Sequence, residues 1–136
     1  MENVRIVLEY LRECEVFYMA TEDGTQPRVR PMSGVCVTEG KLCFFMSRDS
    51  DLYHEIMVNR RVEISARHPD KSWISIRGWL KEETSPEVKD TMRKACKDDI
   101  EDMGLIGDKD MAVLSLQGGT VRIEDRNDGR EKDMEL

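Results

Sequence analysis

The stretch that decides the fold reads FYMATEDGTQPRVRPMSGV and covers residues 17–35. The run over residues 16–21 (VFYMAT), with which this stretch begins after Val16, is rich in β-branched and aromatic residues, which predicts a β-strand. The turn that follows contains Asp23-Gly24, and this dipeptide tolerates the positive φ of a tight hairpin. The chain is therefore expected to reverse direction here and to return as a second strand beside the first.

The returning segment, residues 27–38, is predicted to be a strand with an interrupted edge. Pro27 and Pro31 donate no backbone hydrogen bond, so this strand must lie at an edge of the sheet or be irregular along part of its length. Gly34 is expected to form a bulge. Such a strand leaves main-chain groups free for a ligand.

The spacing of apolar residues predicts further helices and strands along the rest of the chain. Helices are expected at residues 2–14, after a cap at Asp49 or Ser50, and from Thr84, which has capping-box spacing to Glu87. Further strands are expected at residues 41–47, 62–66, 73–80, 111–116 and 120–124, with a turn or bulge at Gly118-Gly119. Meandering strands with small helices at the ends predict a mainly β fold, an antiparallel, Greek-key-like barrel.

One domain accounts for nearly the whole chain in this prediction. A chain of 136 residues can bury one core, and we place a single barrel domain at residues 1–125. Residues 97–110 are acidic and broken by glycine, and no element is assigned to them. Residues 126–136, which read RNDGREKDMEL, are predicted to be a frayed polar tail.

Composition excludes several classes of protein. Hydrophobic residues make up 39% of the chain and charged residues 36%, which fits neither a membrane-spanning nor a disordered protein. The net charge of −7 argues against partners such as nucleic acid or an anionic membrane. Residues 28–79 nevertheless carry nine Lys or Arg against six Asp or Glu. This cationic middle could attract a small anion such as phosphate, or its arginines could pair with the acidic flanks.

The four cysteines, Cys14, Cys36, Cys43 and Cys96, are expected to be free thiols used for packing. No two of them are separated by two residues, so the spacing indicates neither a zinc site nor a redox pair. Charged residues interrupt the N-terminus too early for a signal peptide, and reduced thiols then favour a cytoplasmic location. No metal site is expected, because the two histidines have no ligand cluster at metal spacing.

The sequence lacks the motifs that would identify a catalytic class. No Gly-rich loop opens a helix as in dinucleotide-binding proteins, and no serine lies in a nucleophile-elbow pattern. The residue pattern by itself therefore predicts a barrel with a cationic middle and assigns no catalytic acid or base.

Three segments in order carry a resemblance to a known family: residues 17–35, residues 41–66 (KLCFFMSRDSDLYHEIMVNRRVEISA) and residues 73–80 (WISIRGWL). They contain F-x-x-A-T, Asp-Gly and P-R-x-R-P, then a strand ending in two aromatics. Together they resemble the pyridoxamine 5′-phosphate oxidase-like flavoproteins, and most of all the small nitroimidazole-reductase-like (Nim) bacterial members. The resemblance implies an FMN-binding split barrel, a homodimer, and FMN bound in a groove between the subunits.

The resemblance also implies which residues hold the cofactor. The P-R-x-R-P strand of the family lies along the flavin, and the third strand with the following helix start holds the phosphate. Trp73 matches a position near the ring system, although it could equally pack the barrel. The implied cofactor-binding residues are Arg28, Arg30, Pro31, Met32, Phe45, Met46, Ser47, Arg48, Ser50 and Trp73. We expect Arg30→Ala to weaken FMN binding and to leave the melting temperature nearly unchanged.

The chain departs from the family pattern where the phosphate is expected. Met46 stands where the family commonly has Thr, and Ser50, Asp51 and Leu52 stand where it commonly has Lys or Arg. Asp49 and Asp51 therefore place two negative charges at the expected phosphate position, where each would repel the ligand.

Two functions of different classes follow from the resemblance and from this departure. The first is an FMN-dependent oxidoreductase that reduces a small electrophile, such as a nitroaromatic or a quinone, with the chemistry supplied by the flavin. The second is a non-catalytic split-barrel module that binds or senses flavin or another phosphate-bearing ligand. The acids at the phosphate position favour the second.

Overall fold

A computed structural model describes residues 2–105, 110–127 and 129–136 of the chain. The helices are α1 (Glu2–Cys14), α2 (Asp51–Val58), α3 (Pro86–Ala95) and α4 (Lys97–Asp102). The strands are β1 (Phe17–Asp23), β2 (Gln26–Met32), β3 (Val35–Thr38), β4 (Lys41–Ser47), β5 (Arg61–Arg67), β6 (Trp73–Glu83), β7 (Met111–Glu124) and β8 (Glu131–Glu135).

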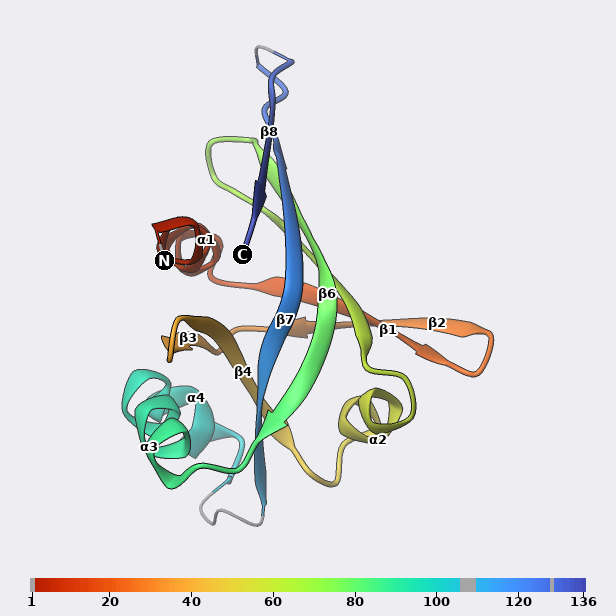
Figure 1. The fold of residues 1–136 in the computed structure, drawn as a ribbon, viewed down its shortest axis with the longest axis vertical. Coiled ribbons are helices and arrows are strands. Elements are labelled where there is room, and N and C mark those ends of the chain that lie inside the picture. Colours follow the sequence, from red (N-terminus) through yellow and green to blue (C-terminus); the bar gives the residue numbers. More distant parts are fainter. Residues whose placement is uncertain (1, 106–109, 128) are drawn as a thin grey trace.

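The strands form one antiparallel sheet that curves into a split barrel. The order along the sheet is β2-β1-β5-β6-β7-β4-β3, and β8 pairs with β7 off this path. The chain passes directly from β2 to β3 although they lie at opposite ends of this order, so the sheet must curve back on itself. Figure 1 shows β6 and β7 running along the molecule, with the β1–β2 hairpin projecting to one side. The predicted mainly β, antiparallel split barrel is confirmed.

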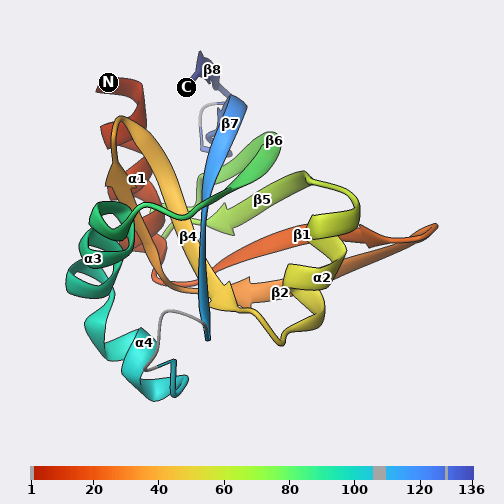
Figure 2. The same ribbon diagram turned by 60° about the horizontal axis from the view of Figure 1, so that its bottom comes forward.

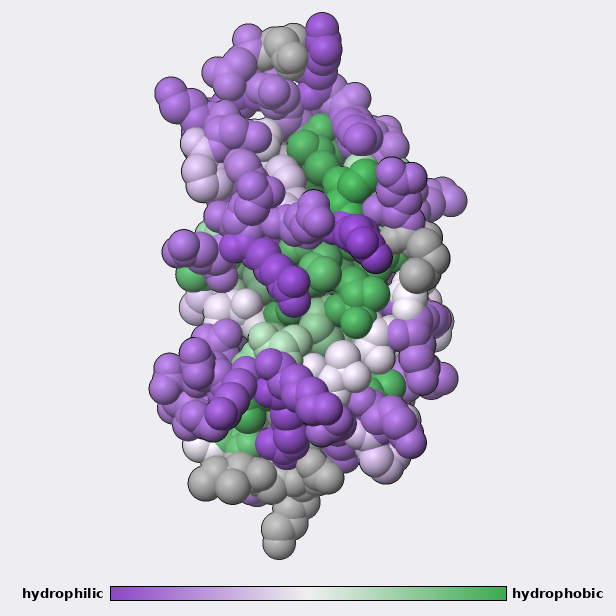
Figure 3. Space-filling model, turned by 90° about the vertical axis from the view of Figure 1, so that its left-hand side faces the viewer, coloured by the Kyte–Doolittle hydropathy of each residue, from purple (hydrophilic) through white to green (hydrophobic). Residues whose placement is uncertain are grey.

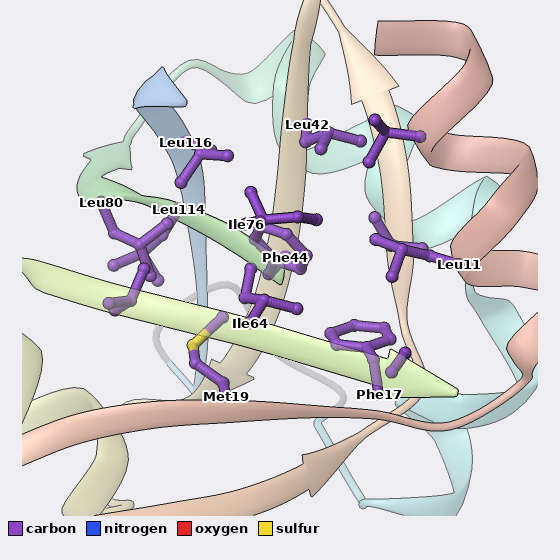
Figure 4. Close-up of a cluster of buried hydrophobic side chains, with 14 of the residues drawn as sticks. Leu11, Phe17, Met19, Leu42, Phe44, Ile64, Ile76, Leu80, Leu114 and Leu116 are labelled. Carbon is purple, nitrogen blue, oxygen red and sulfur yellow. The ribbon is translucent and has the colours of Figure 1, made fainter. Parts of the chain in front are cut away.

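Apolar side chains from alternate strand positions fill the barrel. Met19 of β1 lies opposite Ile64 of β5, which lies opposite Ile76 of β6, and all three are fully buried. Figure 4 shows them pointing into one space together with Phe17 and Phe44. Burying each such side chain contributes about 1.5–3 kcal/mol. The interior is thus occupied by the core, and we look for a ligand site on the outside of the barrel.

The helices cover the ends and one outer face of the barrel. The apolar stripe of α1, with Val7 and Leu11 fully buried, packs on β3, β4 and β5, and α2 packs on β1 and β4. α3 lies on β3, β4 and β7 (Figure 2). Figure 3 shows apolar side chains gathered in the middle of the side that carries α1 and α3. None of the described helices is long and apolar enough to cross a membrane.

The segment between β2 and β3 differs from the prediction of one strand over 27–38. β2 ends at Met32 and β3 begins at Val35. Gly34 lies between them and is required by a close contact, because a Cβ atom there would lie 2.0 Å from the Cε1 atom of Phe45. The expected bulge at Gly34 is therefore wrong. The expected edge position is confirmed for β2, which is the first strand of the sheet order.

The predicted frayed tail over residues 126–136 is wrong. β8 pairs with the end of β7, with Met134 opposite Val121, and Met134 is buried. On the outer side, Arg122 donates two hydrogen bonds to Asp133, at 2.9 and 3.2 Å. The sequence predicts a frayed tail because its only large apolar side chains are Met134 and Leu136. No local pattern indicates that the tail pairs with the end of β7.

The observed helix ends and the course of β7 can be compared with the predictions in the same way. Ser50 caps α2, since its Oγ accepts a hydrogen bond from the Tyr53 N–H at 3.1 Å. α3 begins after Ser85, whose hydroxyl donates to the Glu87 carboxylate, so the Thr84 capping box is wrong. α4 lies in the acidic segment to which no element was assigned. β7 continues through Gly118-Gly119 with a bulge against β6, so of the predicted turn or bulge at these glycines the bulge is correct.

A second apolar cluster lies outside the barrel, beneath α3 and α4, and contains three of the cysteines. Cys36 and Cys43 lie directly opposite each other on β3 and β4, and Cys96 follows α3. All four cysteines of the chain are free thiols, and Cys14 is half-buried. Burial raises the pKa of Cys14 and Cys36 to about 11 and that of Cys43 to about 12.

We predict that the rate of thiol labelling distinguishes Cys14 from the other three cysteines. At neutral pH the raised pKa values keep the thiols protonated, and Cys14 should react fastest in the folded protein because it is half-buried while the other three are buried. Labelling in denaturant without reductant should find four. Cys14→Ser should remove the fast reaction and leave three thiols in denaturant. A count of two in the unmodified chain would contradict the free-thiol assignment.

Candidate functional site

The residues that sequence analysis proposed for a cofactor fall into two separate regions. Most of them surround α2, on β2 and on the turn from β4 into α2. Trp73 begins β6 and lies on the outer face of the sheet. We describe the α2 region first and then the groove beside Trp73.

The cationic face of β2 is directed toward α2. Arg30 donates two hydrogen bonds to the Glu55 carboxylate, at 2.9 and 2.8 Å, and Thr21 donates a third at 2.8 Å. Hydrogen bonds from Arg30 lower the pKa of Glu55 to about 2. Arg28 is more exposed and lies 3.9 Å from Asp23. Arg30 is therefore occupied by a buried carboxylate, and Arg28 has a weak surface pair.

The turn from β4 into α2 uses its polar groups internally. The Ser50 hydroxyl donates to the Ser47 carbonyl at 2.6 Å while it caps the helix, and the Ser47 hydroxyl accepts from the Asp49 N–H at 3.2 Å. The side chains of Phe45 and Met46 are buried in the two apolar clusters. Of the predicted phosphate-binding residues, these two could therefore contact a ligand only through their main chain.

Arg48 is held by a carboxylate from another strand. Its guanidinium forms an ion pair with Glu82 at 2.5 Å and donates to the Tyr53 hydroxyl at 3.1 Å. The Tyr53 hydroxyl donates in turn to Glu82 at 2.7 Å, and this hydrogen bond raises the pKa of Tyr53. The three side chains come from β6, α2 and the turn between β4 and α2, and each of them contacts the other two.

The charges around α2 do not fit a phosphate dianion well. Arg30 and Arg48 are each neutralised by a glutamate, and Asp49 and Asp51 add two negative charges at the turn. The alternative interpretation of the cationic middle, that its arginines pair with carboxylates, is correct for Arg30 and Arg48, and for Arg77, which pairs with Glu63. A ligand phosphate could gain an arginine here only by displacing a carboxylate.

A groove of about 570 Å³ lies on the outer face of β6, β7 and β8. Trp73, Ser75 and Arg77 line it from β6, since alternate residues of a strand lie on one face. Thr120 and Arg122 line it from β7, and Asp133 from β8. An indole beside hydrogen-bonding side chains is suited to a planar aromatic ring with polar edges.

The two regions are at opposite ends of β7. Ser47 lies opposite Met111 at the start of this strand, and Trp73 lies opposite Glu124 at its end. At about 3.3 Å per residue, thirteen residues of strand span roughly 40 Å. The structure therefore does not bring Trp73 together with Ser47, Arg48 and Ser50, and one flavin-sized ligand cannot contact both ends of β7 in a single chain.

Sequence reasoning missed three residues that define the α2 region. The burial of Glu55 has no signal in the sequence, because charged residues are mostly exposed. Tyr53 has a half-buried ring, and its hydroxyl is used by Arg48. Glu82 is far along the chain in β6, and no local pattern links it to Arg48. No group of three or more His, Cys, Asp or Glu among residues 2–105, 110–127 and 129–136 is arranged to hold a metal ion.

We predict that Arg30→Ala destabilises the protein, contrary to the expectation of an unchanged melting temperature. The change leaves the Glu55 carboxylate buried and unpaired, and should lower the free energy of unfolding by about 3 kcal/mol at neutral pH. Since the pKa of Glu55 is lower in the folded chain, the stability from this pair is complete above pH 4.5 and is lost as the pH falls toward 2.

Chemical denaturation at neutral pH and at acidic pH measures this effect. The difference between the Arg30→Ala variant and the unmodified chain should shrink as the carboxyl becomes protonated. Arg28→Ala is the matched control, and its exposed pair should change stability by less than about 0.5 kcal/mol. Equal losses of stability in the two variants would show that the Arg30–Glu55 pair contributes no more than the exposed Arg28–Asp23 pair.

Comparison with solved structures gives strong matches. A NimC/NimA family protein from Clostridium acetobutylicum is 32% identical, with a TM-score of 0.92, over 99% of this chain and 93% of that one. A Clostridium acetobutylicum protein of the pyridoxinephosphate oxidase family, related to general stress protein 26, has a TM-score of 0.73 at 9% identity, over 99% and 95%. An FAD-binding protein from Mesorhizobium loti has 0.63 at 15%, over 88% and 91%.

A scan against models of protein families finds no match, and neither does a search of curated proteins. The two weaker structural matches show that the barrel is the one found in the pyridoxinephosphate oxidase family and in a flavin-binding protein. Identity of about a third over almost the whole of both chains shows more than the fold. The chain belongs to the NimC/NimA family.

Proposed function

We propose that this protein is a dimeric, FMN-binding oxidoreductase that reduces a small electrophile such as a nitroaromatic or a quinone. The observation that carries the proposal is the groove beside Trp73, on an exposed sheet face of a chain that belongs to the NimC/NimA family. A flavin bound there would supply the hydride or electrons. The residues of this chain would bind and orient the ring and exclude water from it.

A second copy of the chain would complete the site. The outer face of β1, β2, β5 and β6 carries Tyr18, Val29 and Trp79, which remain 48%, 66% and 42% exposed. Ala20, Pro31, Ser65 and Ser75 lie on the same face, according to the strand register. The register also places the Arg77–Glu63 ion pair on this face, so it combines exposed apolar and small side chains with a charged pair, and such a surface is suited to an isologous interface.

Dimerisation would also resolve the separation of the two regions. One subunit would supply the α2 region with Arg28, Arg30 and Ser47, and its partner would supply the groove with Trp73. Pro31 lies on the outer face of β2, where it would meet the partner. The predicted site residues could then contact one ligand in a groove between subunits, as the resemblance implies.

A non-catalytic module that binds or senses flavin, or another phosphate-bearing ligand, is the second candidate. The neutralised arginines favour it, because Arg30 and Arg48 are satisfied without a ligand. Such a module would bind its ligand weakly or only under particular conditions. No side chain of the α2 region is needed as an acid or base in either function.

We predict that adding FMN to the purified protein quenches flavin fluorescence and gives bound flavin that bleaches with a reductant. Reoxidation of the bleached protein by a nitroaromatic or a quinone would support the oxidoreductase. Trp73→Ala should weaken flavin binding by about tenfold, since stacking on an aromatic ring is lost. Flavin that binds and bleaches but is not reoxidised by either electrophile would favour the binding module, and no quenching at all would overturn both flavin functions.

We predict a dimer in sedimentation at micromolar concentration. Tyr18→Glu places a charge at the centre of the proposed interface and should weaken the dimer by at least about tenfold. Met103→Glu is the matched control, since Met103 is 56% exposed at the end of α4, an element that belongs neither to this face nor to the α2 region. A 15.8 kDa species for the unmodified chain would contradict the proposed interface.

A further inference from the structure

We infer that Glu82 sets the charge preference of the ligand site, so that this chain binds the flavin ring with little preference for the 5′-phosphate. The inference rests on the proposed function, because it concerns the same α2 region. Glu82 occupies the arginine that a ligand phosphate would need. The carboxylate thus takes the place of the phosphate within the protein itself.

The contacts of Glu82 use both of its oxygens. One oxygen pairs with Arg48 at 2.5 Å, and the other accepts the Tyr53 hydroxyl at 2.7 Å. Arg48 donates to the same hydroxyl at 3.1 Å and lies 5.6 Å from the centre of the tyrosine ring. Because each member contacts the other two, Arg48 cannot turn to a ligand without breaking two of these contacts.

Burial strengthens the pairing against competition. The side chains of Arg48 and Glu82 are 28% and 17% exposed, so water and salt screen the pair less than a surface pair. A phosphate that displaced Glu82 would leave its carboxylate without a cation beside a dianion. Asp49 and Asp51 at the same turn would repel that phosphate further. A flavin without the phosphate meets neither obstacle.

Glu82 is better suited to this role than Glu55. The Glu55 carboxylate is held by Arg30 and Thr21 and supports the packing of α2, so its replacement would disturb the fold. Glu82→Gln keeps the size of the side chain and an oxygen that can accept from Tyr53, while it removes the charge that neutralises Arg48. Glu83 offers a matched control one residue further on, since its carboxylate accepts from Ser115 instead.

Fluorescence titration of the unmodified chain, Glu82→Gln and Glu83→Gln with FMN and with riboflavin tests the inference. The unmodified chain should bind the two flavins with affinities within about threefold of each other. Glu82→Gln should tighten FMN by about tenfold or more, as one charge-assisted hydrogen bond to phosphate would. Its affinity for riboflavin should stay within about threefold, and Glu83→Gln should behave as the unmodified chain does.

The outcomes separate failure of the inference from failure of the proposed function. A strong preference of the unmodified chain for FMN, or equal effects of the two glutamine variants, would overturn the role of Glu82 while flavin binding stands. If no variant binds either flavin, the proposed function fails, and inorganic phosphate becomes the probe. Phosphate should then raise the melting temperature of Glu82→Gln alone, relative to chloride at equal ionic strength, and no such rise would overturn the inference as well.

Discussion

The hydrogen-bonded pairing of β6 with β7 is the interaction on which the rest of the structure depends. β7 is the longest strand, and it pairs with β6 along almost its whole length, with β4 at its start and with β8 at its end. Its inward side chains, Leu114, Leu116 and Val121, complete the core. Near its end, the outward side chains of Thr120 and Arg122 line the groove. The pairing of β6 with β7 therefore positions both the core residues inside the barrel and the residues that line the candidate ligand groove.

The length of this ladder is the reason that the site we propose requires a second copy of the chain. The turn that holds Ser47 and Arg48 is fixed to one end of β7, and Trp73 is fixed to the other end. No side-chain movement can bridge a strand of this length. In the dimer that we propose, an isologous pair of exposed sheet faces would bring the opposite ends of two copies together.

Charge pairing is the second constraint on function. A cationic segment within an acidic chain invites an anion, but the fold places a glutamate against each of the two least exposed arginines that the resemblance assigned to the ligand. The pairs stabilise α2 against β2 and β6, and the same contacts reduce the attraction for a phosphate. Stability and ligand preference are therefore linked through the same side chains in this part of the molecule.

The sequence by itself determined the local elements and the family. The strand in the β-branched and aromatic run of residues 16–21, the Asp23-Gly24 turn and the strand over residues 73–80 depend on neighbours in the chain, and each appears in the structure. The tertiary structure alone decided what lies far apart in sequence: that Glu82 meets Arg48, that β8 pairs with β7, and that Trp73 is remote from Ser47. These contacts depend on strand order and register, which bring residues together regardless of their spacing and leave no signal in the local pattern.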